Sequence, residues 1–497
     1  MIITDRERCN DALNKVVNAY WVRCKRRLEE VDRRSLVLRC IRNNEAVIAE
    51  QDNWKRTRRA VVALHHDQRD VVLASQKARE EMDRTQISHR IMVEMAICTC
   101  PDDSGREAAQ EDVDYLGAQI LQMVATAQES DAMRAEAIPA WVQISLAGDI
   151  RLESDFSHLM RPYMLSHFEV SHRSDIKDYE RHFTEPAHGT KTEEEAFGQA
   201  FVHAFLDEYG IAPARLAEVS TVLAEYAYHQ HTDILVQSRS SLLDILSNAG
   251  FSEKEFNGLM QHFVLPNRPD WTSVHAPFRP KDWWLWRYRR HLSLMARPLV
   301  ALNHEIVAYA PGFCEDSFRH VVMEAYSGAF DTEYFSSRSM KKYTGAVNGR
   351  SGLDFNKAVA SRFDQLGWKV WTEIPMSQLH CPESEASGDI DVVAVKDGVV
   401  FLCECKDLSF ARTITEVVDQ LGRFRGNRGD DLWKHIRRFE WIQRNAAELR
   451  LVIGQQPKEI RSLLVTSKIV PMQHLETFSG AVTPIDSLPG YLQQLVN

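Results

Sequence analysis

The chain has 497 residues, of which 44% are hydrophobic and 26% are charged, a composition typical of soluble globular domains. Its formal net charge of −10 argues against a broadly basic protein that coats nucleic acid, so contact with a polyanion has to depend on local basic patches. Nine cysteines without a CxxC pair argue against a zinc site and favour a reducing compartment. The charged N-terminus and the lack of a long apolar run predict a cytoplasmic protein with no membrane partner.

The first two of four predicted regions are helical. Residues 1–150 are expected to form long charged helices and then a short mixed segment, because strong helix formers dominate and Gly and Pro are absent up to about residue 97. Their basic clusters are interpreted as solvated helix faces rather than phosphate contacts. Residues 151–280 read as a helical interaction or regulatory region, where Ser252 and Glu255 predict a capping box. Such helices would recruit a partner protein or a second copy of the chain.

The third region, residues 281–350, is predicted to be an aromatic and basic connector with a hairpin and helices. It opens with the run DWWLWRYRR at residues 282–290. Tryptophans interleaved with arginines can stack on bases and bind phosphates. They also commonly join one domain to the next, with arginine stems packed alongside, and we favour this second interpretation.

The fourth region, residues 351–497, predicts an α/β domain. An apolar stripe at Phe355, Val359 and Phe363 indicates a first helix, and β-branched or apolar runs predict strands at 368–374, 392–395, 399–403, 462–466 and 482–485. The predicted fold is therefore a multidomain chain, mainly α-helical in its N-terminal two thirds, with a C-terminal α/β domain whose mixed central sheet is flanked by helices.

The hairpin in this domain carries charges at one end of apolar strands. Asp397-Gly398 is a strong signal for a two-residue turn. Counting back from this turn places Asp391 opposite Glu404, and Asp389 opposite Lys406. Because residues two apart in a strand share a face, all four side chains are expected to project to one side.

Two directly opposed carboxylates repel each other, and a divalent cation between them would remove that cost. Mg²⁺ prefers oxygen ligands and commonly uses one or two carboxylates together with a substrate phosphate. A lysine beside the ion would orient water or stabilise charge on the phosphate. The alternative is a solvated hairpin end whose four charges pair with one another, which fits poorly with the apolar positions on both faces of the strands.

The hairpin resembles that of the PD-(D/E)xK nuclease superfamily, in which an Asp opens one strand and an acid-x-Lys follows on the next. The matching residues are Asp391 and the run Glu404-Cys405-Lys406. The resemblance, which covers residues 352 onward, implies a restriction-endonuclease-like fold and Mg²⁺ or Mn²⁺ bound by Asp391, Glu404 and the backbone carbonyl of Cys405. It implies that Lys406 orients or activates the water. It also implies DNA rather than RNA as substrate, because DNA enzymes dominate the family.

The sequence departs from that family on the first helix, where many members place a Glu one residue after an aromatic. Asn356 follows Phe355 here, which puts a second metal ion in doubt. Gln420 and Phe424 are similar to the Gln-x-x-x-Tyr of one branch, so Gln420 is expected to support the site while Phe424 lies in the core. A local excess of basic residues is the polarity expected where a phosphate backbone docks: Arg423, Arg425, Arg428, Lys434, Arg437 and Arg438.

These features predict a Mg²⁺-dependent endonuclease in which Asp391, Glu404 and Lys406 are catalytic, with Asp389 as a supporting residue. By analogy of architecture, the helical regions would control it, as in restriction or antiphage effectors. The alternative, favoured by Asn356, is a non-catalytic nucleic-acid-binding or assembly protein with a degenerate nuclease-like domain.

Overall fold

The computed structural model describes residues 1–64, 69–102, 104–145, 150–152, 160–166, 198–287, 289–382, 388–408, 410–411, 413–474 and 481–496. The chain forms two compact units, and each unit is assembled from separate stretches of sequence. One unit contains residues 1–11, 128–170 and 347–497, and the other contains residues 12–127 and 171–346. The predicted division into four regions stays a prediction. None of the helices described is both long and apolar enough to cross a membrane.

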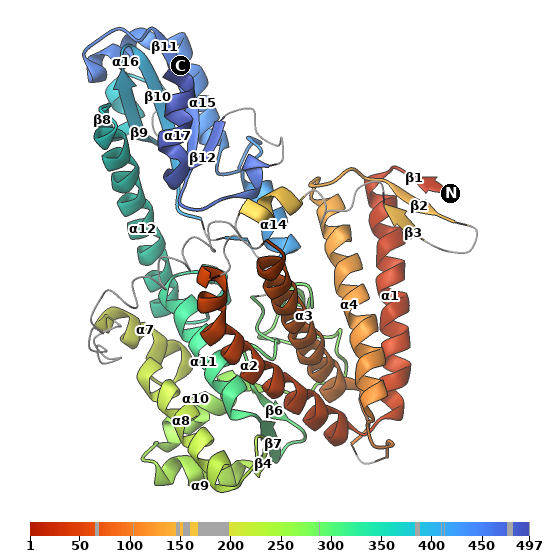
Figure 1. Cartoon of the computed structure of the whole chain (residues 1–497). Helices are drawn as coiled ribbons and strands as arrows, with labels where there is room; N and C mark the ends of the chain where they lie inside the picture. The colour runs from red at the N-terminus through yellow and green to blue at the C-terminus, as the bar shows by residue number, and fades with distance from the viewer. Residues whose placement is uncertain are drawn as a thin grey trace. The chain divides into compact units, whose positions relative to one another are not determined.

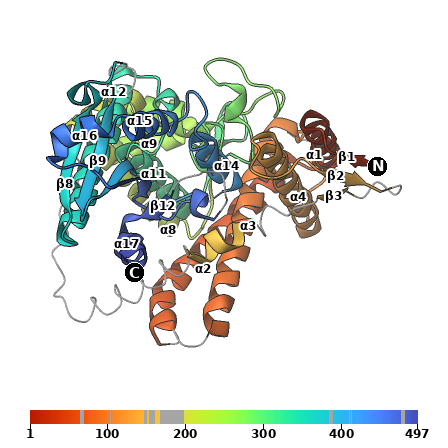
Figure 2. The ribbon, with the colours of Figure 1, turned by 90° about the horizontal axis from the view of Figure 1, so that it is seen from above.

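Long helices occupy the first part of the chain, as predicted: α1 (Arg6–Glu30), α2 (Arg33–Leu64), α3 (Arg69–Thr99) and α4 (Gln110–Arg134). Helices α2 and α3 lie side by side (Figures 1 and 2). Their contact is apolar near Cys40, whose thiol lies 3.3 Å from the sulfur of Met92, and polar near Gln51, which forms hydrogen bonds with Asp83 and Gln86. A small three-stranded sheet joins both ends of this region, with the strands β1 (Ile2–Ile3), β2 (Val142–Ile144) and β3 (Ile150–Leu152).

The middle of the chain packs helices around a four-stranded sheet. The helices are α7 (Gln199–Tyr209), α8 (Pro213–His229), α9 (Arg239–Asn248), α10 (Glu253–Phe263) and α11 (Pro311–Tyr326). The strands, in spatial order, are β4 (Leu235–Ser238), β7 (Ile306–Tyr309), β6 (Leu299–Ala301) and β5 (Val264–Leu265). The capping box predicted at Ser252 and Glu255 starts α10.

The aromatic connector packs inward. Trp283 and Trp286 are partly buried against the same apolar core as α2 and α3, and the rings of Trp271 and Trp283 lie 5.1 Å apart. Arg290 at the end of the run is 5% exposed and forms a two-pronged ion pair with Glu94 of α3, with N–O distances of 2.6 and 3.0 Å. These contacts show that the run packs into the core of one unit; its expected role in joining two domains stays a prediction.

The C-terminal sheet has five strands in the order β12-β11-β10-β9-β8 (Figure 1). Strands β8, β9 and β10 are antiparallel neighbours, whereas β10, β11 and β12 run parallel. This mixed sheet confirms the predicted fold class. Its strands are β8 (Lys369–Pro375), β9 (Asp389–Lys396), β10 (Val399–Lys406), β11 (Glu459–Thr466) and β12 (Ala481–Pro484).

Helices cover both faces of this sheet, because the strands are apolar on both sides. One core joins the sheet to the helices α12 (Arg338–Gln365) and α17 (Leu488–Val496). The opposite core joins it to α15 (Trp433–Arg444) and α16 (Ala446–Ile453). Helix α14 (Ile414–Arg423) starts at the capping box of Thr413 and Glu416. Short 3-10 turns lie at Pro280–Asp282, Thr332–Tyr334, Met376–Leu379, Pro471–Gln473 and Ile485–Ser487.

Candidate active site at the charged end of the hairpin

The β9–β10 hairpin has the register that its turn predicts. Asp397 and Gly398 adopt φ angles of 54° and 89°, the pair of positive values that a type I′ turn requires. Lys396 pairs with Val399, and the ladder continues through the pair of Val392 and Cys403. This register is the one counted from the sequence, and it directs Asp391 and Glu404 to the end of the ladder.

The backbone pairing of β9 and β10 ends at Val392 and Cys403, and beyond it the side chain of Asp391 bonds to β10. Oδ2 of Asp391 accepts a hydrogen bond from the backbone N–H of Cys405 at 2.7 Å, in a position where a strand would normally offer a carbonyl. The side chain of Asp389 is exposed and forms no ion pair with Lys406 among the residues described. The predicted juxtaposition of Asp389 and Lys406 is therefore wrong, since the two strands no longer pair beyond Val392.

Glu404 is the most densely contacted acid of the site. It is 4% exposed, and its Oε1 lies 2.9 Å from Nζ of Lys406. Its Oε2 accepts a hydrogen bond from Nη2 of Arg438 on α15, and Nδ1 of His435 lies 3.5 Å from the same oxygen. Arg438 also donates to the backbone carbonyl of Asp389, so α15 closes over the end of the hairpin.

The two acids titrate in opposite directions. Burial and the charge of Glu404 raise the pKa of Asp391 from 3.8 to about 7. Burial opposes ionisation of Glu404 as well, but the nearby charges of Lys406 and Arg438 outweigh it and hold the pKa of Glu404 below its usual value. Near neutral pH, Glu404 is thus the permanent anion and Asp391 the acid whose charge depends on its surroundings.

The basic groups differ in the same way. Burial alone would lower the pKa of Lys406, but Glu404 and Asp391 raise it above its usual value, so the amine stays protonated. Burial lowers the pKa of His435 from 6.5 to about 4, and its Nε2 lies 2.8 Å from Oγ of Ser462 on β11. His435 is therefore neutral, and Lys406 acts as a cation rather than as a base.

Asn356 lies on α12 beside the neighbouring strand. It is 7% exposed, and its Nδ2 donates to Oε1 of Glu373 at 2.5 Å. Glu373 adopts a left-handed φ of 52° and interrupts β8 opposite Asp391, between two regular pairs of the β8–β9 ladder. The Oδ1 of Asn356 is buried and has no hydrogen-bond partner among the residues described. Asn356, at the position where many of the nucleases that the domain resembles have a Glu, therefore forms a hydrogen bond with an acid, Glu373.

The remaining predicted residues take varied positions. Gln420 is buried on α14, and Phe424 is fully buried, as predicted for a core residue. Of the basic residues expected to contact nucleic acid, Arg438 belongs to the site itself. The others lie outside it: Arg423 pairs with Asp431, Arg425 with Glu136 at 3.4 Å, Arg437 lies over the ring of Trp433, and Arg428 and Lys434 are exposed.

A model of one protein family matches residues 2–485, and that family is described as the Upx-like anti-phage proteins. The match spans nearly the whole chain. The chain belongs to the Upx-like anti-phage family. No curated protein and no solved structure matches the sequence significantly. The family match indicates a role in phage defence, and the chemistry has to be argued from the geometry of the site.

Two side chains of the site, His435 and Arg438, were not predicted to belong to it. His435 had no role assigned, and Arg438 was assigned to a basic surface that docks a phosphate backbone. Both are among the buried residues of α15, together with Ile442, at intervals of three and four residues. Polar residues at the apolar positions of an amphipathic helix were the available signal.

The oxygen donors fit one divalent cation, with one condition. Among the residues that the structure describes, no group of three or more His, Cys, Asp or Glu side chains is arranged to hold a metal ion. Oδ1 of Asp391 has no protein partner among them. Burial and the nearby charge of Glu404 raise the pKa of Asp391, and a cation would relieve the repulsion between the two carboxylates. Both oxygens of Glu404 are occupied, so Arg438 would have to release one of them.

Proposed function

We propose that this Upx-like protein is a Mg²⁺- or Mn²⁺-dependent endonuclease that cuts DNA, and that the cut is its contribution to phage defence. Membership of the family supports the defence role. One observation carries the chemical part of the proposal: the buried Glu404 and the partly buried Asp391 lie at the end of a hairpin beside a protonated lysine, and burial together with the charge of Glu404 raises the pKa of Asp391. Perturbed acids of this kind are concentrated at catalytic sites.

The ion would be held by Asp391 and Glu404, with the backbone carbonyl of Cys405 as a further oxygen ligand. A bound divalent cation would supply Lewis-acid activation of the scissile phosphate and of water. Lys406 stays protonated beside Glu404, so its role is to place a positive charge next to the phosphate and stabilise negative charge that develops there. His435, neutral and bonded to Ser462, positions Glu404 rather than transferring a proton.

Arg438 gives the proposal a specific substrate requirement. With Asp391 and Glu404 both ionised, Lys406 and Arg438 balance the charge of the site, which makes it a poor trap for a dication alone. A guanidinium binds phosphate with two parallel hydrogen bonds. We infer that a DNA phosphate draws Arg438 from Glu404, and that metal and DNA bind together.

A second candidate function is supported by the same contact. If Arg438 keeps Glu404 when DNA is bound, the cation site stays closed and the unit retains nucleic acid without cutting it. The helical regions would then assemble partners on the bound strand. This candidate predicts retention of DNA that is unaffected by EDTA.

The decisive experiment follows nicking of supercoiled plasmid by the full chain in Mg²⁺, Mn²⁺ and EDTA, with single-stranded DNA and RNA in parallel. We expect cleavage that EDTA abolishes, and a loss of at least about a hundredfold in Glu404→Gln and Lys406→Ala. Two variants outside the site in the same unit, Glu448→Gln at a partly exposed residue and Lys369→Ala at an exposed one, serve as matched controls and should cut like the wild type.

Circular dichroism has to show that the inactive variants are folded. If Glu404→Gln and Lys406→Ala both cut DNA at the rate of the controls, the nuclease proposal is wrong. If the wild type retains plasmid on a filter equally in EDTA and in Mg²⁺ but does not cut any of the three substrates, the binding function replaces it.

A further inference from the structure

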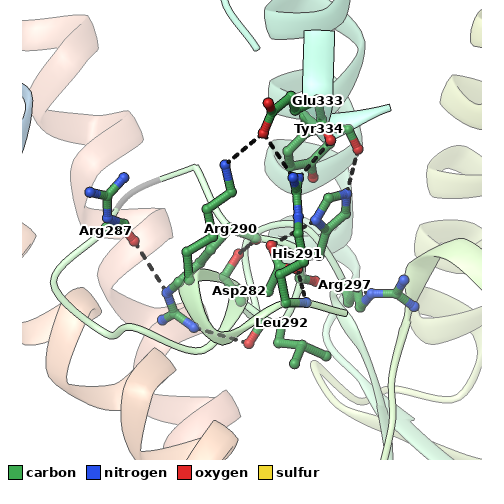
Figure 3. A network of polar contacts seen from close by, with 11 residues as sticks. Asp282, Arg287, Arg290, His291, Leu292, Arg297, Glu333 and Tyr334 are labelled. Carbon is green, nitrogen blue, oxygen red and sulfur yellow. Dashed lines mark hydrogen bonds and ion pairs between the residues drawn. The ribbon is translucent and has the colours of Figure 1, made fainter. Parts of the chain in front are cut away.

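A second concave site lies in the unit formed by residues 12–127 and 171–346. It is a cavity of about 730 Å³ between α7, α10, β6 and the loop that precedes β6, within the size range of pockets for small-molecule ligands. The proposed nuclease residues do not line it. Its wall contains the polar network of Asp282, His291, Tyr334 and Glu333 (Figure 3).

Arg297 brings to this cavity a positive charge that no carboxylate contacts directly among the residues described. It is 8% exposed, and three backbone carbonyls hold it: Nε donates to His291 at 3.0 Å, and Nη1 donates to Gln261 at 2.8 Å and to Val264 at 3.0 Å. Within the described part of the chain, Arg297 has no carboxylate partner and its Nη2 has no hydrogen bond. Buried charges are normally paired, so this guanidinium is prepared for an anion.

The acids of the cavity wall are already engaged with other groups. Asp282 lies 2.9 Å from Nδ1 of His291 (Figure 3). Glu333 accepts a hydrogen bond from Nη1 of Arg279 at 2.9 Å. The third acid, Glu208, accepts hydrogen bonds of 2.6–3.1 Å from backbone N–H groups that precede α12. Each acid therefore has its own donor, and none is paired with the guanidinium of the cavity.

Aromatic surfaces and unused polar groups surround the charge. The guanidinium of Arg297 lies 5.2 Å from the ring centre of Phe278. The hydroxyl of Tyr209 is buried and has no hydrogen-bond partner among the residues described, which is rare for a buried hydroxyl. Burial lowers the pKa of His262 to about 4, so this ring is neutral. The cavity combines one anion-binding group with flat rings and hydrogen-bonding atoms.

Arg239 adds a second cation to the lining of the cavity. It is exposed at the start of α9 and lines the cavity, and no ion pair involving Arg239 is found in the described ranges. Two arginines without carboxylate partners on one cavity favour a phosphate, which has oxygens for both.

We propose that this cavity binds a planar organic phosphate of mononucleotide size. The phosphate lies at Arg297 and Arg239, and the ring lies against Phe278. The site is independent of the proposed nuclease centre, and a ligand bound there stabilises the unit that contains it.

The test is a thermal-shift titration of the full chain in EDTA, so that metal-dependent binding elsewhere does not contribute. The probes are AMP, GMP, CMP and UMP, the four corresponding nucleosides, and inorganic phosphate. We expect at least one nucleotide at millimolar concentration to raise the melting temperature by about 3 °C or more, and its nucleoside to raise it by less than about 1 °C. The absence of a shift with all four nucleotides, or equal shifts with the matching nucleoside, overturns the proposal.

Two variants assign the binding to the cavity, and calorimetry gives their dissociation constants. Arg297→Lys keeps the charge but loses the planar fork, and it should weaken binding about tenfold or more. Arg239→Gln removes an exposed charge without disturbing the fold and should weaken binding about fivefold, so it decides the question if Arg297→Lys does not fold. Arg319→Gln, a surface change on α11 outside the cavity, should bind like the wild type. Unchanged affinity in Arg239→Gln would reject the assignment.

Discussion

Nζ of Lys406 lies 2.9 Å from one oxygen of Glu404, and Arg438 donates to the other oxygen of the same carboxylate. One buried acid thus pairs with two cations from different elements, a strand and a helix. Because Glu404 has no oxygen left over, any cation that enters the site competes with Arg438. A substitution of Arg438 should therefore change the affinity of the site for a metal ion.

Arg438→Gln is expected to increase the affinity of the protein for Mn²⁺ in the absence of DNA by about tenfold or more. The substitution removes one positive charge next to the ion, and a unit charge at close range is worth at least about 1 kcal/mol even in a strongly screened site. Isothermal titration with Mn²⁺ measures the change. The matched control is Arg437→Gln, one residue away on the outer face of α15, and it should leave the affinity unchanged. Equal affinities of Arg438→Gln and the wild type would show that Arg438 does not compete with metal.

Asp391 makes the stability of the protein depend on pH in a particular direction. Its pKa of about 7 in the folded state lies above the value near 3.9 of an unfolded chain, so the folded state holds the proton more tightly. The free energy of unfolding therefore falls as pH rises from about 4 to 7. His435, whose folded pKa is lowered to about 4, acts in the opposite direction between about 4 and 6.5.

The contribution of Asp391 is isolated by comparing the wild type with Asp391→Asn in urea denaturation with EDTA. Relative to the wild type, the variant should become more stable by up to about 3 kcal/mol between pH 4.5 and 7.5. Excess Mg²⁺ should reduce this difference, since the ion favours the ionised carboxyl. A difference that stays constant across this pH range would contradict the raised pKa.

The buried ion pair of Arg290 and Glu94 should dominate the stability of its unit. Arg290→Ala leaves Glu94, which is 1% exposed, without its partner, and we expect the free energy of unfolding to fall by about 3–5 kcal/mol. Arg319→Ala breaks an exposed pair with Glu315 and should cost less than about 1 kcal/mol. Thermal and urea unfolding of both variants measure the contrast. Similar decreases in the free energy of unfolding of the two variants would show that the buried ion pair contributes no more to stability than the exposed one.

The hairpin was predictable because its information is local. Asp397 and Gly398 select the turn, and alternation along two strands then fixes which side chains meet, from Lys396 and Val399 onward. The capping box of Thr413 and Glu416 is predictable for the same reason: two residues three positions apart determine it.

The rest of the site depends on contacts that no local pattern encodes. Arg438 reaches Glu404 because α15 packs across one face of the sheet, and the angle of that packing follows from a whole core of side chains. Its place among basic neighbours suggested a phosphate-binding face instead. Asn356 was recognisable as a departure from the family pattern, but its bond to Glu373 requires a left-handed residue inside β8, which propensities do not predict.

The discontinuous make-up of the C-terminal unit has a consequence for how the protein is made. Tyr163 exchanges hydrogen bonds with Ala411, and Glu136 pairs with Arg425. Segments synthesised early therefore cannot form these contacts until the C-terminal residues have been synthesised. Such distant pairings slow folding. A ribosome that stalls before residue 400 releases a chain without Glu404 and Lys406. Cutting the gene at residue 351 likewise removes Glu136 and Tyr163 from the product. The proposed site can therefore assemble only after residues of the C-terminal stretch have been synthesised and have packed against the earlier ones.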